Sequence, residues 1–176
     1  MKLLRLPVVC LAAGLAGLLP AAVSTAQDSR PAASAFEHFK LLTGEWIDVE
    51  GAGGTKGAVL ATYRLTGGGS AVVETLFPGT PHEMTTIYHR DGNDLVLTHY
   101  CAAGNQPRMR ARTVKGNTVA FEFDGGTHFD PAVDMHMHEA QIEFVSADEI
   151  RAHWKAWNKG QPSPHSPNFR LQRKRS

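Results

Sequence analysis

Cysteine is scarce in this sequence of 176 residues, which contains only Cys10 and Cys101. Cys10 lies in an N-terminal segment that we expect to be removed, so Cys101 is left without a partner for a disulfide within the chain. An excess of charge is also lacking, since 18 basic residues balance 17 acidic ones. This balance argues against a nucleic-acid partner.

Because no disulfide can form within the chain, its stability must come from an apolar core. The chain is long enough to bury such a core as one domain.

A long apolar run is absent as well, and the nearest approach to one has the pattern of a secretory signal peptide. Lys2 and Arg5 form a short positive region, residues 6–19 are mostly apolar, and residues 24–26 form the small-x-small pattern Ser-Thr-Ala. We expect cleavage after Ala26 and therefore a periplasmic or secreted protein. No transmembrane segment is expected in the mature protein.

Composition divides the chain into four parts. We expect a signal peptide at 1–26, a linker rich in Ser, Ala and Pro at 27–35, a folded domain at 36–173 and a basic tail at 174–176. A short helix is predicted from Ala35 to Leu42, with Ser34 as its cap and with Phe36, Phe39 and Leu42 on one face. We expect this apolar face to plug one end of a barrel.

From Glu45 onward, polar and apolar residues alternate with the period of β-strands. The predicted strands are 45–50, 57–66, 70–77, 82–90, 94–101, 107–114, 117–124, 134–145, 149–157 and 167–173. Short breaks rich in glycine separate them, which favours tight turns. No helical segment of length intervenes, so parallel βαβ units are excluded. The prediction is an all-β, up-and-down antiparallel barrel of about 8–10 strands that closes to remove its edges, with an open sandwich as the second choice.

Two sets of residues resemble known barrels. A short helix followed by Gly44-Glu45-Trp46 and a meander of strands resembles the lipocalin and calycin class. More closely, residues 67–84 (GGGSAVVETLFPGTPHEM), 98–101 (THYC) and 105–107 (NQP) resemble a family of uncharacterised exported bacterial barrels. This resemblance covers nearly the whole mature chain. The resemblance implies a barrel fold and export from the cytoplasm, but it does not imply a particular function.

Nitrobindins and fatty-acid-binding barrels are more distant in shape. Nitrobindins also begin with Gly-x-Trp, but residues 47–50 depart from their glycine-rich continuation. Their haem-ligating histidine comes late in the barrel, whereas the late histidines here, His153 and His165, stand in different surroundings. The comparison therefore argues against haem as a cofactor.

Strand alternation predicts which side chains face the interior. On 95–101 the interior set is Leu95, Leu97, His99 and Cys101, and on 134–145 it includes His136 and His138 with Ala140 and Ile142. On 82–89, His82 and Tyr88 share a face. A barrel of this size can hold one small ligand, so these side chains predict a mostly apolar site with a few polar groups.

Three kinds of chemistry are open at this site. His136-x-His138 with His99 matches the three-histidine arrangement of catalytic zinc, although such histidines also serve as ordinary hydrogen-bonding groups. Acid–base catalysis needs a pair across strands, such as Glu74 or Glu83 with His99, because sequence neighbours face opposite ways. Cys101 could be a nucleophile, but a buried thiol acting as a small hydrophobe is the favoured interpretation.

The loop before the strand at 107–114 adds further candidates. Asn105 and Gln106 either shape the turn or contact a ligand together with Arg108, whose guanidinium suits a carboxylate. The leading hypothesis is a barrel that binds a small, mostly apolar ligand without catalysis. The alternatives are an enzyme that uses the interior histidines, with or without a metal, and a structural or interaction domain of the periplasm.

Overall fold

The computed structural model describes residues 30–175, so the expected signal peptide and its cleavage site lie outside the described residues. In chain order the elements are α1 (Arg30–Lys40), β1 (Gly44–Asp48), β2 (Val59–Thr66), the 3-10 turn η1 (Gly67–Gly69), β3 (Ala71–Leu76), β4 (Met84–Asp91), β5 (Asp94–Tyr100), β6 (Gln106–Lys115), β7 (Thr118–Thr127), β8 (His136–Ser146), β9 (Glu149–Asn158), β10 (Gln161–Pro162) and β11 (Asn168–Arg173).

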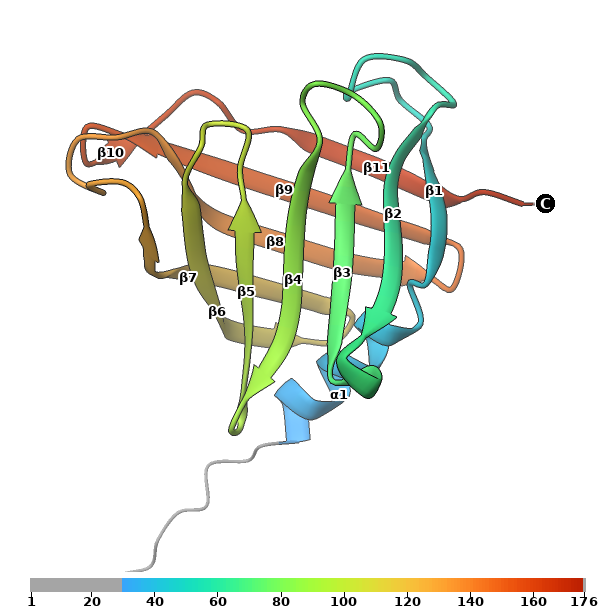
Figure 1. Ribbon diagram of the computed structural model, residues 1–176. Coiled ribbons are helices and arrows are strands. Elements are labelled where there is room, and N and C mark those ends of the chain that lie inside the picture. The colour runs from blue at the N-terminus through green and yellow to red at the C-terminus, as the bar shows by residue number, and fades with distance from the viewer. Residues whose placement is uncertain (1–29, 176) are drawn as a thin grey trace, which may run out of the picture.

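The strands form a closed antiparallel barrel (Figure 1). Consecutive strands pair from β1 to β9, β9 pairs with β11, and β11 returns to β1. Ten strands make up this ring, while the two-residue β10 pairs with β9. The predicted up-and-down barrel with a short N-terminal helix is confirmed, and the open sandwich is wrong. The closed ring is compatible with a lipocalin-like barrel.

Each predicted strand is present, with ends that differ by three residues or fewer. The helix differs more, because it begins at Arg30 and ends at Lys40 instead of running from Ala35 to Leu42. The segment interpreted as a linker, 27–35, therefore contributes to the helix. A proline at 31 fits the first helical turn, and the alanines that follow have the highest helix propensity.

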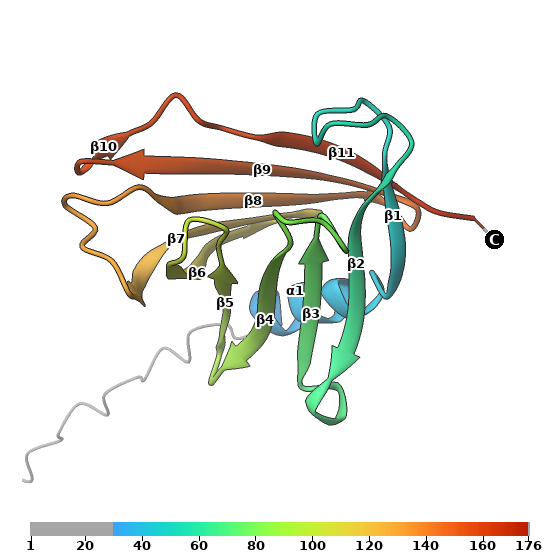
Figure 2. The same ribbon diagram turned by 45° about the horizontal axis from the view of Figure 1, so that its top comes forward.

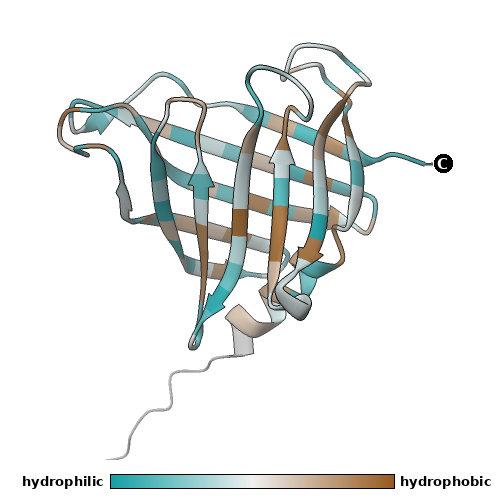
Figure 3. Ribbon diagram, in the orientation of Figure 1, coloured by the Kyte–Doolittle hydropathy of each residue, from teal (hydrophilic) through white to brown (hydrophobic). Residues whose placement is uncertain are grey.

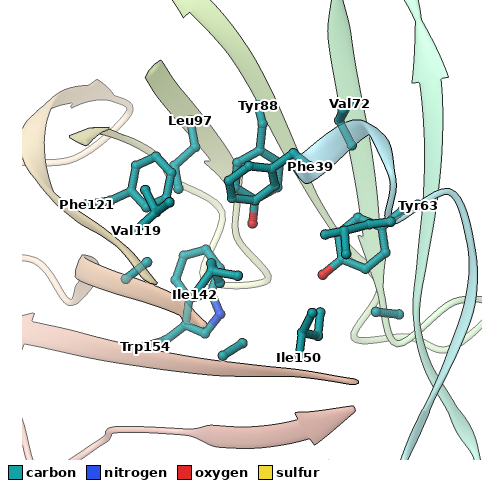
Figure 4. Packing of buried hydrophobic residues seen from close by; sticks show 14 of the residues in the cluster. Phe39, Tyr63, Val72, Tyr88, Leu97, Val119, Phe121, Ile142, Ile150 and Trp154 are labelled. Atoms are coloured by element: carbon teal, nitrogen blue, oxygen red, sulfur yellow. The ribbon is translucent and has the colours of Figure 1, made fainter. Parts of the chain in front are cut away.

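Helix α1 closes one end of the barrel, as predicted. Phe36, Phe39 and Leu42 are buried in the same core cluster as the inward side chains of the strands. The ring of Phe39 stacks on that of Tyr88, with 4.3 Å between their centroids (Figure 4). The helix thus supplies the aromatic floor of the barrel.

The other end of the barrel carries the longer connections (Figure 2). These are residues 49–58, 77–83, 101–105, 128–135 and 159–167. Along the strands, hydrophobic and hydrophilic residues alternate, as a barrel with one buried face requires (Figure 3). Within residues 30–175, no helix is long and apolar enough to cross a membrane.

Candidate functional site

A cavity of about 240 Å³ lies beneath the longer connections, at the end of the barrel away from α1. Its wall is mostly apolar and comes from strands and from three of the loops. The lining residues are Ala52, Gly53, Leu76, Phe77, Met84, His99, Met137, Trp154, His165, Pro167 and Phe169. Mostly apolar walls with a few polar groups are typical of small-molecule sites.

Two backbone features shape the rim of this cavity. Phe77 adopts the left-handed region with φ of 52°, which is a costly conformation for an aromatic residue and is found most often at functional sites. Gly53 packs so closely that a Cβ atom on it would overlap Leu60. The loop carrying Gly53 is fixed by Asp48, whose buried carboxylate accepts hydrogen bonds from the backbone N–H groups of Glu50, Gly51 and Gly53.

Four buried polar residues form one row across the barrel wall. Tyr63 on β2 pairs in register with Glu74 on β3, Glu74 with Thr86 on β4, and Thr86 with His99 on β5. Direct cross-strand partners project to the same face of a sheet, so all four side chains point inward. Each is at most 3% exposed. We call Tyr63, Glu74, Thr86 and His99 the polar row.

Glu74 is the hub of the polar row. Its Oε1 accepts a hydrogen bond of 2.6 Å from the Tyr63 hydroxyl, and its Oε2 accepts one of 2.8 Å from the Tyr88 hydroxyl. Burial raises the pKa of Glu74, while hydrogen bonds from Tyr63, Tyr88 and Thr86 lower it in part. Two hydroxyl donors on one carboxyl group, one to each oxygen, suit a carboxylate, which only accepts hydrogen bonds.

His99 connects the polar row to the cavity. Its Nδ1 lies 2.9 Å from the hydroxyl of Thr86. Its Nε2 is buried and has no hydrogen-bond partner within residues 30–175, and the residue lines the cavity. Burial lowers the pKa of His99 to about 4, so the ring is neutral at neutral pH. The ring lies 4.9 Å from that of Trp154, whose Nε1 is likewise buried and unpartnered in the described part of the chain.

The free energy of unfolding is expected to fall on acidification because of His99. Its folded pKa is lowered from 6.5 to about 4, so in this window the unfolded chain binds a proton that the folded chain does not. The loss should reach about 2–3 kcal/mol between neutral pH and pH 4. Urea titrations over this range, compared with the His99→Phe variant, measure it. The raised pKa of Glu74 changes the free energy of unfolding in the opposite direction, but it does so equally in the unchanged protein and in His99→Phe. If both proteins show the same dependence of the free energy of unfolding on pH, the expectation is contradicted.

The expected inward face of β8 requires a correction. Met137 pairs with Ala156 on β9, and Ala140 pairs with Trp154. The partners are two residues apart on β9 but three apart on β8, so β8 contains a β-bulge at His138. Strict alternation counted back from Ala140 predicts that His138 and His136 face the interior, but the extra residue changes which side chains do so. Met137 lines the cavity, and the two histidines of this strand do not.

His136 and His138 belong to a separate aromatic cluster. The ring of His138 is stacked between Trp157, at 3.9 Å, and Phe123, at 4.7 Å. Nδ1 of His136 lies 2.9 Å from the carbonyl oxygen of Asp134, and its Nε2 lies 2.9 Å from Nδ1 of His138. Neither histidine is among the residues that line the cavity. The two histidines therefore lie outside the wall of this cavity, and their role as ligand-binding residues stays a prediction.

The zinc hypothesis needed His99, His136 and His138 to converge. Within residues 30–175, no group of three or more His, Cys, Asp or Glu side chains is placed to hold a metal ion. Nε2 of His136 already faces Nδ1 of its neighbour on β8. Among the described residues, His99, His136 and His138 thus do not come together as such a group.

Two other predicted residues lie away from the cavity wall. His82 is exposed in the loop between β3 and β4. Cys101 follows β5 and is half-buried, and its backbone N–H donates to the carbonyl of Asn105. Burial raises the pKa of the Cys101 thiol, which favours the protonated, poorly nucleophilic form.

The loop residues have structural partners. The Asn105 amide donates to the backbone carbonyl of Met135 at 2.8 Å and so ties two loops of the open end together. Gln106 donates to the carbonyl of Gly104. Arg108 forms an ion pair of 2.8 Å with Asp91 on the outer surface. None of the three predicted contact residues lies in the cavity wall.

Of the predicted residues, the structure brings together Tyr88 and His99, through Glu74 and Thr86. Glu74 was considered as a partner of His99 across strands, and the structure adds Thr86 between them. Tyr63 and Thr86 were not predicted. In the sequence, each residue of the polar row could be noticed as a polar residue on an otherwise apolar strand face. Only the register between the strands shows that the four lie side by side.

Comparison of the sequence with models of known protein families found no match, and comparison with curated proteins found none either.

Proposed function

We propose that this protein is an exported β-barrel that binds a small, mostly apolar molecule in the cavity, without carrying out chemistry on it. The observation that carries the proposal is an apolar wall that includes His99, whose buried Nε2 has no hydrogen-bond partner among residues 30–175. Buried polar groups are nearly always hydrogen-bonded. A buried nitrogen without a partner in a residue of the cavity wall therefore supports a ligand that supplies this partner.

The volume limits the size of this molecule. A cavity of about 150 Å³ holds benzene, so 240 Å³ corresponds by proportion to about ten non-hydrogen atoms. Propylbenzene is close to this size and has no polar group. It is therefore a suitable probe for the apolar part of the site.

Propylbenzene is expected to shift the methyl signals of Met84 and Met137 in protein labelled with ¹³C-methyl methionine. Both side chains line the cavity. Met109 is fully buried in the core and Met135 is partly exposed on a loop, and neither is among the lining residues, so their signals serve as internal references. Equal shifts at all methionines would indicate non-specific association, and no shift would favour a structural or interaction domain.

A blocked cavity provides the matched control. Met84→Trp places a larger side chain in the lining and is expected to abolish the shift at Met137. Met135→Trp makes the same exchange outside the lining and should leave propylbenzene binding intact. If Met84→Trp binds the probe as well as the unchanged protein does, the site lies elsewhere.

Export is supported by the pattern of residues 1–26 and by the resemblance to exported bacterial barrels. It predicts that the protein recovered from the periplasm or the medium has an intact mass lacking these residues. Retention of the segment in cytosolic protein would contradict this part of the proposal.

Acid–base catalysis is the second candidate, favoured by one observation. Glu74, Thr86 and a neutral His99 form a line from a carboxyl group to an imidazole at the cavity. Such a line orients an imidazole for proton transfer. If a compound recovered from the protein were converted on incubation, and His99→Phe stopped the conversion, this candidate would replace simple binding.

A further inference from the structure

The polar row determines which hydrogen-bonding group the cavity offers to its ligand. We propose that the ligand is an uncharged molecule with a hydroxyl group, a small alcohol or phenol, whose O–H donates a hydrogen bond to Nε2 of His99. This inference rests on the proposed function, because it assigns the polar end of the molecule that the apolar cavity holds.

The first step concerns the proton of the Thr86 hydroxyl. The two carboxyl oxygens of Glu74 accept from Tyr63 and Tyr88, and Thr86, the direct cross-strand partner of Glu74, places its hydroxyl on the same inner face beside this carboxyl group. A hydroxyl has a single proton. Once that proton is directed at Glu74, the oxygen of Thr86 can only accept from His99.

The second step follows the hydrogen bonds into the imidazole. Nδ1 of His99 lies 2.9 Å from the oxygen of Thr86 and must carry the ring proton that this oxygen accepts. A neutral imidazole has one N–H, so Nε2 then carries a lone pair. This nitrogen is buried and unpartnered among the described residues. Because His99 lines the cavity, Nε2 is the acceptor that this residue has left for a ligand there.

The third step concerns charge. Among the described residues that line the cavity there is no Asp, Glu, Lys or Arg, and His165 lies exposed at the rim. A carboxylate or an ammonium group would lose its hydration without meeting a counter-ion, which is costly. Ethers and hydrocarbons have no proton to donate to Nε2. A neutral hydroxyl compound satisfies both conditions.

Trp154 complements this acceptor. Its Nε1–H is buried and has no hydrogen-bond partner in the described part of the chain, and its ring lies 4.9 Å from that of His99. A hydroxyl oxygen has lone pairs that can accept this N–H while its proton is donated to Nε2 of His99. One hydroxyl group thus supplies both the donor and the acceptor that these two nitrogens lack among the described residues.

Titration of three probes with the same propylphenyl body tests the proposal at pH 8, with the shift of Met137 as the readout. We expect 4-propylphenol to bind about five- to tenfold more tightly than either propylbenzene or 4-propylanisole, which follows from the net value of one hydrogen bond. The anisole keeps the oxygen but lacks the proton. In His99→Phe the preference for the phenol should disappear, whereas His153→Phe, on the outer face of β9, should retain it.

The outcomes separate this inference from the proposed function. If propylbenzene binds in the cavity and the phenol binds no more tightly than the anisole, the hydroxyl assignment is overturned while apolar binding stands. If no probe binds, both are overturned. A preference that survives in His99→Phe gives the acceptor role to another group, such as His165, and also overturns the assignment.

A second measurement stands if His99→Phe does not fold. Long-range ¹H–¹⁵N spectra of the unchanged protein report which nitrogen of His99 carries the proton. We expect the proton on Nδ1. A proton on Nε2 would make the cavity a donor and would overturn the proposal.

Discussion

Replacement of Trp46 by alanine is expected to lower the free energy of unfolding by about 3–5 kcal/mol, the range for a fully buried aromatic side chain. Trp46 is 0% exposed and packs edge-on against Tyr63. Its Nε1–H donates to the carbonyl of Leu42, just beyond the end of α1, at 2.7 Å. The guanidinium of Arg173 lies over the ring, 4.6 Å from its centroid. The substitution therefore removes both packing and the attachment of the helix.

Arg173 makes the effect on α1 specific. Besides covering Trp46, it donates to the backbone carbonyls of Leu41 and Thr43, each at 2.8 Å. Loss of the indole leaves this guanidinium without its aromatic support. We therefore expect faster amide exchange in α1 than in β4 and β5 of the Trp46→Ala variant.

Urea unfolding of Trp46→Ala and Trp157→Ala provides the comparison. Trp157 is only partly buried and stacks on His138 outside the core cluster, so its removal should cost about 1–2 kcal/mol, as for less buried sites. If the two variants lose equal stability, Trp46 does not hold the helix to the barrel.

The fold was predictable from local patterns. Alternation of polar and apolar residues located each strand, because one face of every barrel strand is buried. Glycine at turns such as Gly92, with φ of 61°, marked where the chain reverses. The start of α1 was missed because Ser, Ala and Pro are shared by linkers and by first helical turns, and only packing of Ala35 and Phe36 against the core decides between them.

The site was less predictable because it depends on the register between strands. His99 was correctly assigned to the interior, since the register of β5 with β4 runs without a bulge from Leu95 to His99. On β8, one extra residue at His138 exchanges the inward and outward faces, and no residue type in that segment marks a bulge. The polar row likewise exists only once four strands are aligned, so residues 63, 74, 86 and 99 have no visible relation in the sequence.

Glu74→Ala is expected to lower the free energy of unfolding by about 3–5 kcal/mol, since each buried hydroxyl left without an acceptor costs about 1–3 kcal/mol. The hydroxyls of Tyr63 and Tyr88 are the two that lose their partner. An opposing effect exists, because burial raises the pKa of Glu74 and its carboxylate therefore carries a desolvation cost that the substitution removes. Two orphaned hydroxyls and a new void outweigh this relief.

A triple variant, Glu74→Leu with Tyr63→Phe and Tyr88→Phe, separates these contributions. It removes donors and acceptor together, and such replacements are close to neutral, so its stability should lie within about 1 kcal/mol of the unchanged protein. Urea unfolding of both variants provides the test, and equal losses would show that the hydroxyls are not the cause. If the triple variant is stable but no longer prefers 4-propylphenol, the buried carboxyl group serves to orient His99 toward the ligand rather than to stabilise the barrel.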